Sequence, residues 1–540
     1  MNQIKTEGFI PSFIYVIINN RVIVVKKGFT LIELLAVILI LGIIALIAIP
    51  TVNNILKEAR RGAFSSTLTN IEKAIENECT LSQIKNKDIN YTYTITDGII
   101  SPSIEIKGDL PDGTIYVDGE CKVNYTLYNN NFSAFKELDE IRIEDKKIYT
   151  EDILNGAVPV LSNNLVPVTI DNDGTVRKAD IYSKWYSYEE KKWANAVILT
   201  ETGKIEDDGT ILENSIESYF VWIPRYKYKL FDMGNYNSVI AEKPSTSNAK
   251  SIEIMFENKN NDISVGTAVG EYHSHPAFQS FDSNGLWVGK FETTGASNNI
   301  QIKPNNSSLR TLQLNTMFEL AYNYKQYNNS HMMKNTEWGA VAYLSISKYG
   351  IDKEININNN SEYMTGYSAV VGTNQSDYPG IHGTDSSVTL PYNTETGYLA
   401  STTGNITGVY DMSGGAHEYM ASFKDGSLGN SGFTSDPTIT YGNNYFDKYL
   451  NNTTATRYNN RILGDATGEL GPFYSYTDGD GYNRYHNSWW LDNSYLIESN
   501  YPWSYRGGTY NYGLVASQLS FFRYTGESSG GISFRLVLSQ

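Results

Sequence analysis

A long apolar run near the N-terminus constrains this chain more than any other feature. From Phe29 to Ile49 there are 21 residues with a single charge, that of Glu33, and Lys26 and Lys27 come just before them. This length fits a membrane-spanning helix, and the two lysines would hold its start on the cytoplasmic side. An ordinary signal peptide is the alternative. However, the run is longer than the apolar region of a typical signal peptide, and no small-x-small cleavage site follows it. Because a carboxylate is costly inside a membrane helix, we expect Glu33 to have a function.

The residues around this start, Lys26-Lys27-Gly28-Phe29-Thr30-Leu31-Ile32-Glu33, resemble the processing site of type IV prepilins and pseudopilins. The resemblance implies that a prepilin peptidase cuts after Gly28, which makes 1–28 a leader, and that the new N-terminal Phe29 is methylated. It also implies that Glu33 pairs with the amino group of Phe29 on a neighbouring subunit during assembly. The implied partners are prepilin peptidase, other pilin subunits and, before assembly, the membrane.

Composition narrows the class of protein. A chain of 540 residues implies several domains. Its net charge of −16, without a basic stripe, argues against a nucleic-acid ligand. The 41 tyrosines, with few charges, suit an extracellular β-rich surface. The two cysteines, Cys79 and Cys121, both follow the apolar run, so outside the membrane a disulfide is favoured over two free thiols.

The residues after the apolar run predict a continuing helix and then a small sheet. Apolar residues recur at helical spacing over 51–78, which predicts an amphipathic helix. Short β-rich runs then alternate with Asp-Gly pairs, which predict hairpin turns at 97–98, 112–113 and 118–119. By its resemblance to pilins, 29–135 is expected to form one domain, with 29–49 as its transmembrane part. Cys79 at the helix end and Cys121 in the sheet would tie the two together.

The sequence contains two further regions of different composition. Residues 136–215 are expected to be a connector, in which Asp171-Asn172-Asp173-Gly174 is a β-turn rather than a calcium loop, since no Glu stands at the twelfth loop position. From about Ile216 a buried-strand pattern, 220–226, opens a long region of short strands and Gly- and Asn-rich loops. We expect 216–540 to be one further domain.

Three groups of residues in this region resemble the formylglycine-generating enzyme (sulfatase-modifying factor) family. They are Thr336-Glu337-Trp338-Gly339-Ala340, then Gly408-Val409-Tyr410-Asp411-Met412-Ser413-Gly414-Gly415-Ala416-His417-Glu418-Tyr419, and finally Arg506-Gly507-Gly508-Thr509-Tyr510 with Ser533-Phe534-Arg535-Leu536. The resemblance implies a C-type-lectin-like fold with much irregular loop. The expected class of the whole chain is therefore α+β: a long pilin helix on a small antiparallel sheet, followed by a large C-type-lectin-like domain.

Departures from that family argue against catalysis. Its enzymes work through a cysteine pair that binds copper, whereas this chain has no cysteine after Cys121. Thiol chemistry and thiolate ligation are therefore excluded from the C-terminal domain, and we expect no enzyme. A zinc hydrolase pattern at His273-Ser274-His275-Pro276 also fails, because position 286 is a leucine where an aspartate ligand is needed.

The same resemblance implies a calcium site at Asp411, Gly414, Ala416 and Glu418. Two carboxylates and two backbone carbonyls would suit this hard cation. The alternative is that Asp411 and Glu418 only cap and bridge the fold, and the sequence leaves both readings open.

A tyrosine-rich segment before the last strand is a candidate ligand-binding face. Tyr, Asn and Arg side chains of this kind supply contact area and adaptable hydrogen bonds. The arrangement also resembles the variable segment of target proteins of diversity-generating retroelements. Alternatively, the aromatic rings simply pack the fold. The candidate residues are Tyr505, Tyr510, Asn511, Tyr512, Arg523 and Tyr524.

Together these features predict a minor, tip-type pilin-like surface protein that displays a non-catalytic ligand-binding or adhesion domain. It would be a single-pass membrane protein before assembly and part of an extracellular filament afterwards. Its ligand would be an extracellular glycan or protein. The alternative is a structural pseudopilin of a type II secretion or DNA-uptake machine, with the C-terminal domain as a cap.

Overall fold

The computed structural model describes most of the chain. Its described residues are 14–18, 21–25, 31–85, 92–96, 98–106, 108–129, 132–137, 140–144, 158–161, 164–181, 183–230, 251–259, 263–266, 270–370, 388–449, 475–477, 483–485, 495 and 497–539. Described side chains begin at Leu56. Gly28 and Phe29, and the side chain of Glu33, therefore lie outside the described part. Two compact units divide the chain, 1–71 and 72–540.

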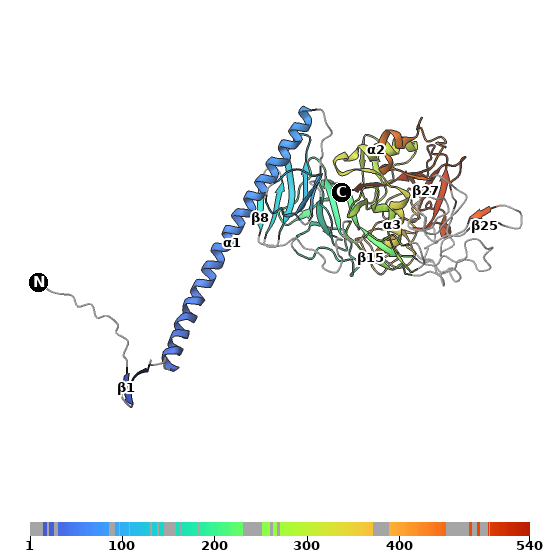
Figure 1. Ribbon diagram of the computed structural model, residues 1–540. Coiled ribbons are helices and arrows are strands. Elements are labelled where there is room, and N and C mark those ends of the chain that lie inside the picture. The colour runs from blue at the N-terminus through green and yellow to red at the C-terminus, as the bar shows by residue number, and fades with distance from the viewer. Residues whose placement is uncertain are drawn as a thin grey trace. The chain divides into compact units, whose positions relative to one another are not determined.

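The helix predicted from the apolar run and its continuation is a single element. Helix α1 runs without interruption from Leu31 to Ile84 (Figure 1). Of the predicted apolar stripe, Leu68, Ile71 and Ile75 are fully buried, whereas Leu56 is 48% exposed. In the part of the chain with described side chains, no helix combines the length and apolarity that a membrane crossing requires; the predicted span, 29–49, lies outside that part.

A six-stranded antiparallel sheet follows α1, in the strand order β4-β3-β5-β6-β7-β8. Its strands are β3 (Thr92–Thr96), β4 (Ile99–Ser101), β5 (Asp112–Val117), β6 (Val123–Tyr128), β7 (Ser133–Glu137) and β8 (Glu140–Glu144). Alternate residues of β6 are buried, with Val123, Tyr125 and Leu127 inside, as the period of two along a strand requires.

The turn predicted at Asp112-Gly113 is wrong, because these residues begin strand β5. Gly113 has φ of 134°, and a Cβ there would lie 2.1 Å from the carbonyl oxygen of Thr126 on β6. The glycine therefore permits a close approach of two strands rather than a hairpin turn. The other two Asp-Gly pairs do separate strands, β3 from β4 and β5 from β6.

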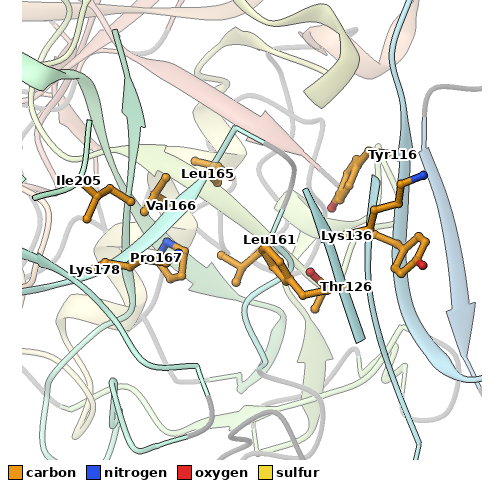
Figure 2. Close-up of a pocket in the computed structure, with 11 residues that line it drawn as sticks. Tyr116, Thr126, Lys136, Leu161, Leu165, Val166, Pro167, Lys178 and Ile205 are labelled. Carbon is orange, nitrogen blue, oxygen red and sulfur yellow. The ribbon is translucent and has the colours of Figure 1, made fainter. Parts of the chain in front are cut away.

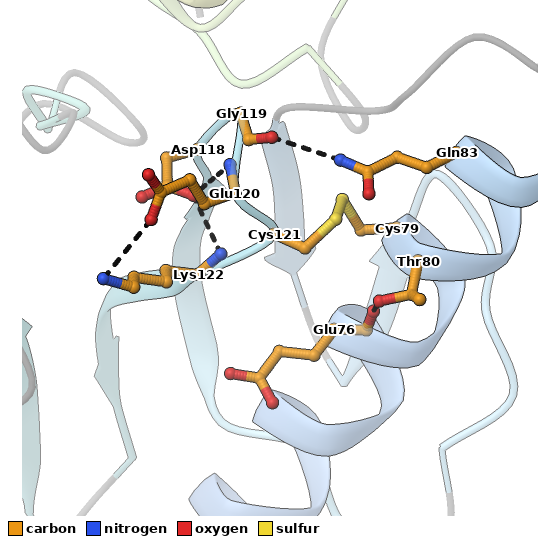
Figure 3. The surroundings of a disulfide bond; sticks show 9 residues. All are labelled: Glu76, Cys79, Thr80, Gln83, Asp118, Gly119, Glu120, Cys121 and Lys122. Atoms are coloured by element: carbon orange, nitrogen blue, oxygen red, sulfur yellow. Dashed lines mark hydrogen bonds and ion pairs between the residues drawn. A yellow bond between two sulfur atoms is a disulfide. The ribbon is translucent and has the colours of Figure 1, made fainter.

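A disulfide joins the end of α1 to this sheet. Cys79 and Cys121 are bonded, with Cα atoms 5.7 Å apart, and Cys121 follows the turn between β5 and β6 (Figure 3). One carboxylate oxygen of Asp118 orders this turn by accepting from the amides of Glu120 and Lys122 at 2.9 and 2.8 Å. The Gln83 side chain also donates to the Gly119 carbonyl at 3.1 Å. Covalent and polar contacts thus hold the last turn of the helix on the sheet.

An eight-stranded antiparallel sheet forms the centre of the rest of unit 72–540, in the order β12-β10-β9-β11-β13-β17-β30-β20. Its strands are β9 (Val166–Ile170), β10 (Val176–Lys178), β11 (Asn195–Leu199), β12 (Thr210–Ile211), β13 (Ile216–Pro224), β17 (Gly285–Gly289), β20 (His331–Met332) and β30 (Leu536–Ser539). Residues 166–211, which the sequence assigns to a connector, supply four of these strands. The predicted β-turn, 171–174, joins β9 to β10 through a hydrogen bond from the Gly174 amide to the Asp171 carbonyl.

A five-stranded sheet and three helices complete the described core. In this sheet β23 (His417–Lys424) pairs with β24 (Asp447–Tyr449), β27 (Trp503–Arg506) and β29 (Ile532–Phe534), and β27 pairs with β28 (Phe521–Tyr524). The helices are α2 (Leu314–Tyr324), α3 (Asn335–Ser345) and α4 (Pro437–Tyr441). The Glu-Trp motif, 336–340, lies on α3. The architecture is therefore α+β, as expected.

The remaining strands form smaller sheets. They comprise β14 (Tyr226–Lys229) with β15 (Ile254–Phe256) and β16 (Tyr272–Ser274), and four hairpins: β1 (Ile14–Ile18) with β2 (Arg21–Val25), β18 (Thr294–Ala296) with β19 (Asn299–Gln301), β21 (Tyr367–Ala369) with β22 (Thr389–Pro391), and β25 (Ser475–Thr477) with β26 (Asn483–Tyr485).

A small cavity marks where the six-stranded and eight-stranded sheets meet within unit 72–540. Figure 2 shows Tyr116, Thr126 and Lys136 on one side of it, and Val166 and Lys178 on the other. The cavity has a volume of about 40 Å³, which is room for only a few water molecules. The two sheets are therefore packed closely against each other.

Candidate ligand-binding face

The tyrosine-rich segment is positioned by the five-stranded sheet. Strand β27 pairs with β28 so that Tyr505 lies opposite Phe522, and it pairs on its other side with β23, where Tyr419 lies opposite Tyr505. Directly opposed side chains share one face of a sheet. The strand pairing therefore gathers aromatic residues from three parts of the chain that are far apart in sequence.

His417 stands at the centre of this aromatic cluster. Its ring centroid lies 4.4 Å from that of Tyr505, 4.8 Å from Tyr512 and 5.3 Å from Phe522, and the rings of Tyr505 and Phe522 are stacked 5.2 Å apart. Only 6% of His417 is exposed, and this burial lowers its pKa to about 3. Among the described residues its Nδ1 atom has no hydrogen-bond partner. The imidazole is therefore neutral at physiological pH.

The six residues predicted for ligand binding do not all reach the surface. Asn511 is exposed, and Tyr510, Tyr512, Arg523 and Tyr524 are half-buried. Tyr505 is only 9% exposed, so its ring supports the face from below rather than forming it. For Tyr505 the packing alternative therefore describes the geometry, while the other five remain accessible in part.

Sequence reasoning missed several members of this face. Arg523 forms an ion pair with Glu498 at 3.0 Å, and its guanidinium lies over the rings of Tyr495 and Tyr501, 6.0 and 5.5 Å from their centroids. Tyr501 is 41% exposed. Tyr495, Glu498 and Tyr501 precede β27, outside the segment on which the prediction concentrated. His417 lies within the motif 408–419 that the sequence analysis singled out, which was the available signal.

We define the face by its partly accessible members, Tyr495, Glu498, Tyr501, Tyr510, Asn511, Tyr512, Arg523 and Tyr524. Aromatic and arginine side chains are enriched at protein-binding surfaces because they give a large contact area at little cost in entropy. The chemistry of the face therefore suits recognition of a ligand.

A cluster of buried charges lies behind this sheet. The guanidinium of Arg535 donates to both carboxylate oxygens of Glu418, at 2.9 and 2.5 Å, and to the carbonyl oxygens of Gly289 and Tyr410. Both members of the ion pair are fully buried. Since β23 carries Glu418 and Arg535 immediately precedes β30, the pair joins the five-stranded sheet to the eight-stranded sheet.

Two more carboxylates, Asp411 and Glu292, belong to the same cluster. Asp411 accepts from the Asn358 side chain at 2.9 Å and from the Gly366 amide at 2.8 Å, and it holds φ at 62°. Glu292 accepts from the Ser308 hydroxyl and, at 2.9 Å, from the Ala416 amide. Three buried carboxylates therefore surround one arginine.

The expected calcium site does not fit this arrangement. Arg535 occupies both oxygens of Glu418, and backbone and side-chain N–H groups occupy Asp411. The Ala416 position presents its amide to Glu292. Among the described residues, no group of three or more His, Cys, Asp or Glu is arranged to hold a metal ion. The other reading, in which Asp411 and Glu418 bridge the fold, describes the observed contacts.

Burial raises the pKa of each of the three carboxyl groups. Burial, aided by Asp411 and Glu418, raises the pKa of Glu292 well above its ordinary 4.5. Burial also raises the pKa of Asp411, although Arg535 opposes this, and it raises that of Glu418 to about 7. The folded protein therefore retains protons that the unfolded chain releases above pH 4.5.

This proton retention predicts a pH-dependent effect of Glu292→Gln. Because a raised carboxyl pKa stabilises the fold only while the group is protonated, the wild type should lose stability as the pH rises from 4.5 through the folded pKa. The glutamine variant cannot ionise. Relative to the wild type, we therefore expect the free energy of unfolding of this variant to rise between pH 4.5 and pH 8. Urea unfolding at both pH values measures the difference.

The exposed Glu395 supplies the control. Glu395→Gln removes one carboxylate outside the cluster and should shift relative stability little between the two pH values. An equal response of both variants to pH would contradict the charge assignment at Glu292.

The discounted zinc pattern is part of the packing. His273 lies on β16 and contacts the Gly266 carbonyl at 3.0 Å through Nδ1. His275 is buried, and its ring lies 5.9 Å from that of Phe278. His273 thus lies on strand β16, and His275 caps the short helical turn 276–278 that follows it.

A long N-terminal helix joined by a disulfide to a small antiparallel sheet defines a pilin-like subunit. A family model described as the prokaryotic N-terminal methylation motif matches residues 25–49. A fimbrial protein of Dichelobacter nodosus is 31% identical to this chain over 145 residues, which cover 24% of this chain and 84% of the relative. The chain belongs to this family of fimbrial proteins. The motif implies processing by a prepilin peptidase and assembly with other pilin subunits.

Proposed function

We propose that this protein is a minor, tip-located subunit of a type IV pilus-like filament, and that its C-terminal module binds an extracellular ligand without catalysis. The observation that carries the proposal is the union of a methylation motif with a module far larger than the pilin-like sheet. The similarity to the fimbrial protein covers only about a quarter of the chain. Repeating so large a module along a filament would crowd it, which favours a position at the tip.

The path to the filament follows from the N-terminal motif. Before assembly, the apolar run over 29–49 holds the chain in the membrane as a single pass. After cleavage behind Gly28, pairing of Glu33 with a neighbour's Phe29 draws the helix into the filament. The exposed Leu56 on α1 offers apolar surface that neighbouring subunits would cover.

The ligand-binding role rests on the face defined above. Its half-exposed tyrosines stand on a support of buried rings, so their positions are held before a ligand arrives. Such preorganisation reduces the entropy lost on binding.

N-terminal mass analysis of protein sheared from the cell surface tests the filament half of the proposal. We expect a chain that begins at methylated Phe29. Gly28→Leu should abolish cleavage and leave the leader in place, because the peptidase cuts after glycine. A leader-bearing wild-type chain that occurs only in membranes would show a plain anchored protein and overturn the proposal.

Surface variants test the display half. Asn511→Ala and Arg523→Met should each weaken binding of filaments to target cells or to an extracellular ligand preparation by about tenfold, because each removes a polar contact group from the face. Asn172→Ala, in the exposed turn after β9, is the matched control and should leave binding unchanged. If deletion of the gene removes all filaments while neither face variant alters binding, an assembly component is the correct reading instead.

A further inference from the structure

A polar groove lies on unit 72–540, formed by elements that the ligand-binding face does not use. It lies between α2, the tip of the β18–β19 hairpin and one residue of β13, and has a volume of about 470 Å³. This size falls within the range of about 300–1,000 Å³ that is common for small-molecule sites. The groove is therefore large enough to hold a compact ligand.

One wall of the groove is a single face of α2. Thr316, Leu320 and Asn323 recur at spacings of four and three, so they lie on one side of the helix, with Glu319 beside them. The opposite side of α2, which includes Met317 and Phe318, is fully buried. Packing of the apolar side against the core thus holds the polar side open to solvent.

The other wall is the β18–β19 hairpin, whose tip is Ser297 and Asn298. Both residues and the following Asn299 are exposed. Their hydroxyl and carboxamide groups both donate and accept hydrogen bonds. This wall therefore offers mixed hydrogen-bonding groups without a net charge.

Glu217 of β13 forms the floor, and its position is held by two neighbours. Its Oε1 atom accepts from the Tyr324 hydroxyl at 2.6 Å and lies 3.2 Å from the Lys325 ammonium. The Glu217 side chain is 16% exposed. Both of these contacts fall on one carboxylate oxygen, Oε1.

We propose that this groove binds a saccharide without acidic groups. Paired carboxylate and carboxamide groups match the neighbouring hydroxyls of a sugar ring, which both donate and accept. Among the described residues that line the groove, Glu201, Glu217 and Glu319 outnumber the one cation, Lys325, so a carboxylated or sulfated sugar would be repelled. The polar lining also disfavours an apolar ligand, because its groups would lose water without compensation.

This inference goes beyond the proposed function and does not depend on it. The groove would take its ligand whether the chain sits at a filament tip, in an assembly machine or in the membrane. A negative result here leaves the N-terminal processing and the aromatic face untouched.

The test uses the full-length protein in detergent, screened against saccharides and then measured by calorimetry. The probes are a neutral oligosaccharide such as lactose, a glucosamine oligomer and a sialylated lactose. We expect binding of lactose, of the glucosamine oligomer or of both, and at least tenfold weaker binding of the sialylated probe. Preferential binding of the glucosamine oligomer would indicate that its ammonium group contacts the Glu217 carboxylate. Preferential binding of lactose would indicate that a sugar hydroxyl makes this contact.

Two variants locate the binding in the groove. Glu217→Gln keeps the shape of the floor but removes its charge, and Asn298→Ala truncates an exposed hairpin side chain, so it should not disturb folding. Each should weaken binding by about tenfold, with an unchanged melting temperature for Asn298→Ala. Glu395→Gln, at an exposed position outside the groove, should bind like the wild type. Failure of every probe to bind, equal binding of the sialylated probe, or binding that both groove variants leave intact would overturn the proposal.

Discussion

Replacing Arg535 by methionine is expected to lower the free energy of unfolding by about 3–5 kcal/mol, the largest effect of any single substitution considered for this protein. Arg535 is fully buried and makes four hydrogen bonds, two of them to Glu418. Methionine keeps the length of the side chain but supplies no charge. Glu292, Asp411 and Glu418 would then share a buried site without a counter-ion.

The effect is large because the substitution leaves buried carboxylates and carbonyls without their partner. Removing one partner of a buried ion pair exposes the other to the full cost of desolvation. Two backbone carbonyls, of Gly289 and Tyr410, would also lose their donor. Urea unfolding followed by tryptophan fluorescence measures the loss, and a sharp fall in soluble yield would be its extreme form.

Arg523→Met is the matched control. Arg523 also pairs with a glutamate, Glu498, but its side chain is 21% exposed and that of its partner 40%. Exposed ion pairs contribute at most about 1 kcal/mol. Equal destabilisation by the two methionine variants would show that the Arg535 cluster does not hold the two sheets together.

Loss of the disulfide is the second large expected effect. Changing Cys79 and Cys121 to serine should lower the free energy of unfolding of the pilin-like sheet by about 4 kcal/mol, the value expected for freeing a loop closed over 42 residues. The bond restricts the unfolded chain and also anchors the last turn of α1 beside the β5–β6 turn. Without it, the contact between Gln83 and Gly119 would have to hold that turn with far less energy.

The chain offers its own control for this measurement. It contains only two cysteines, so a reducing agent acts on this bond alone. The reduced wild type and the double-serine variant should have the same urea midpoint of unfolding. That midpoint should lie below the midpoint of the disulfide-bonded wild type. Coincidence of all three curves would contradict a stabilising role for the bond.

The spacing of apolar residues predicted those helices and strands that have a clear periodicity in their own sequence. Helical spacing identified α1 beyond the apolar run, and alternation identified β3, β5 and β6. The buried run over 220–226 anticipated β13, and the Glu-Trp motif fell on α3. For α1 and these strands, a short segment carries its own pattern and needs no distant partner to reveal it, whereas the motif on α3 was noticed through a family resemblance.

The expected connector shows where such reasoning ends. Val166-Pro167-Val168 reads as linker because proline cannot donate a ladder hydrogen bond and is usually confined to edge strands. In the structure β9 lies between β10 and β11, and Pro167 stands opposite Ala196, while its carbonyl accepts from the Ala179 amide. Pairing with β10 and β11 allows a proline in this strand, and the local sequence does not predict that pairing.

The candidate sites also combine residues that the sequence identified with contacts that only the folded structure reveals. Motif resemblance brought out Asp411 and Glu418, but their partners Glu292 and Arg535 stand more than a hundred residues away, and the pairing changes their role. Likewise, Asn511 and Arg523 were visible as surface chemistry, whereas the packing of His417 against Tyr505 depends on the pairing of β23 with β27. Sequence therefore identified residue types, and strand pairing decided what they do.

The position of β30 has a consequence for biogenesis. This strand, Leu536–Ser539, lies between β17 and β20 in the eight-stranded sheet, and Arg535 directly precedes it. Strand β17 is synthesised more than two hundred residues before this neighbour, so the eight-stranded sheet can close only after β30 has been made. A chain that stopped before Leu536 would leave β17 and β20 without the strand that joins them.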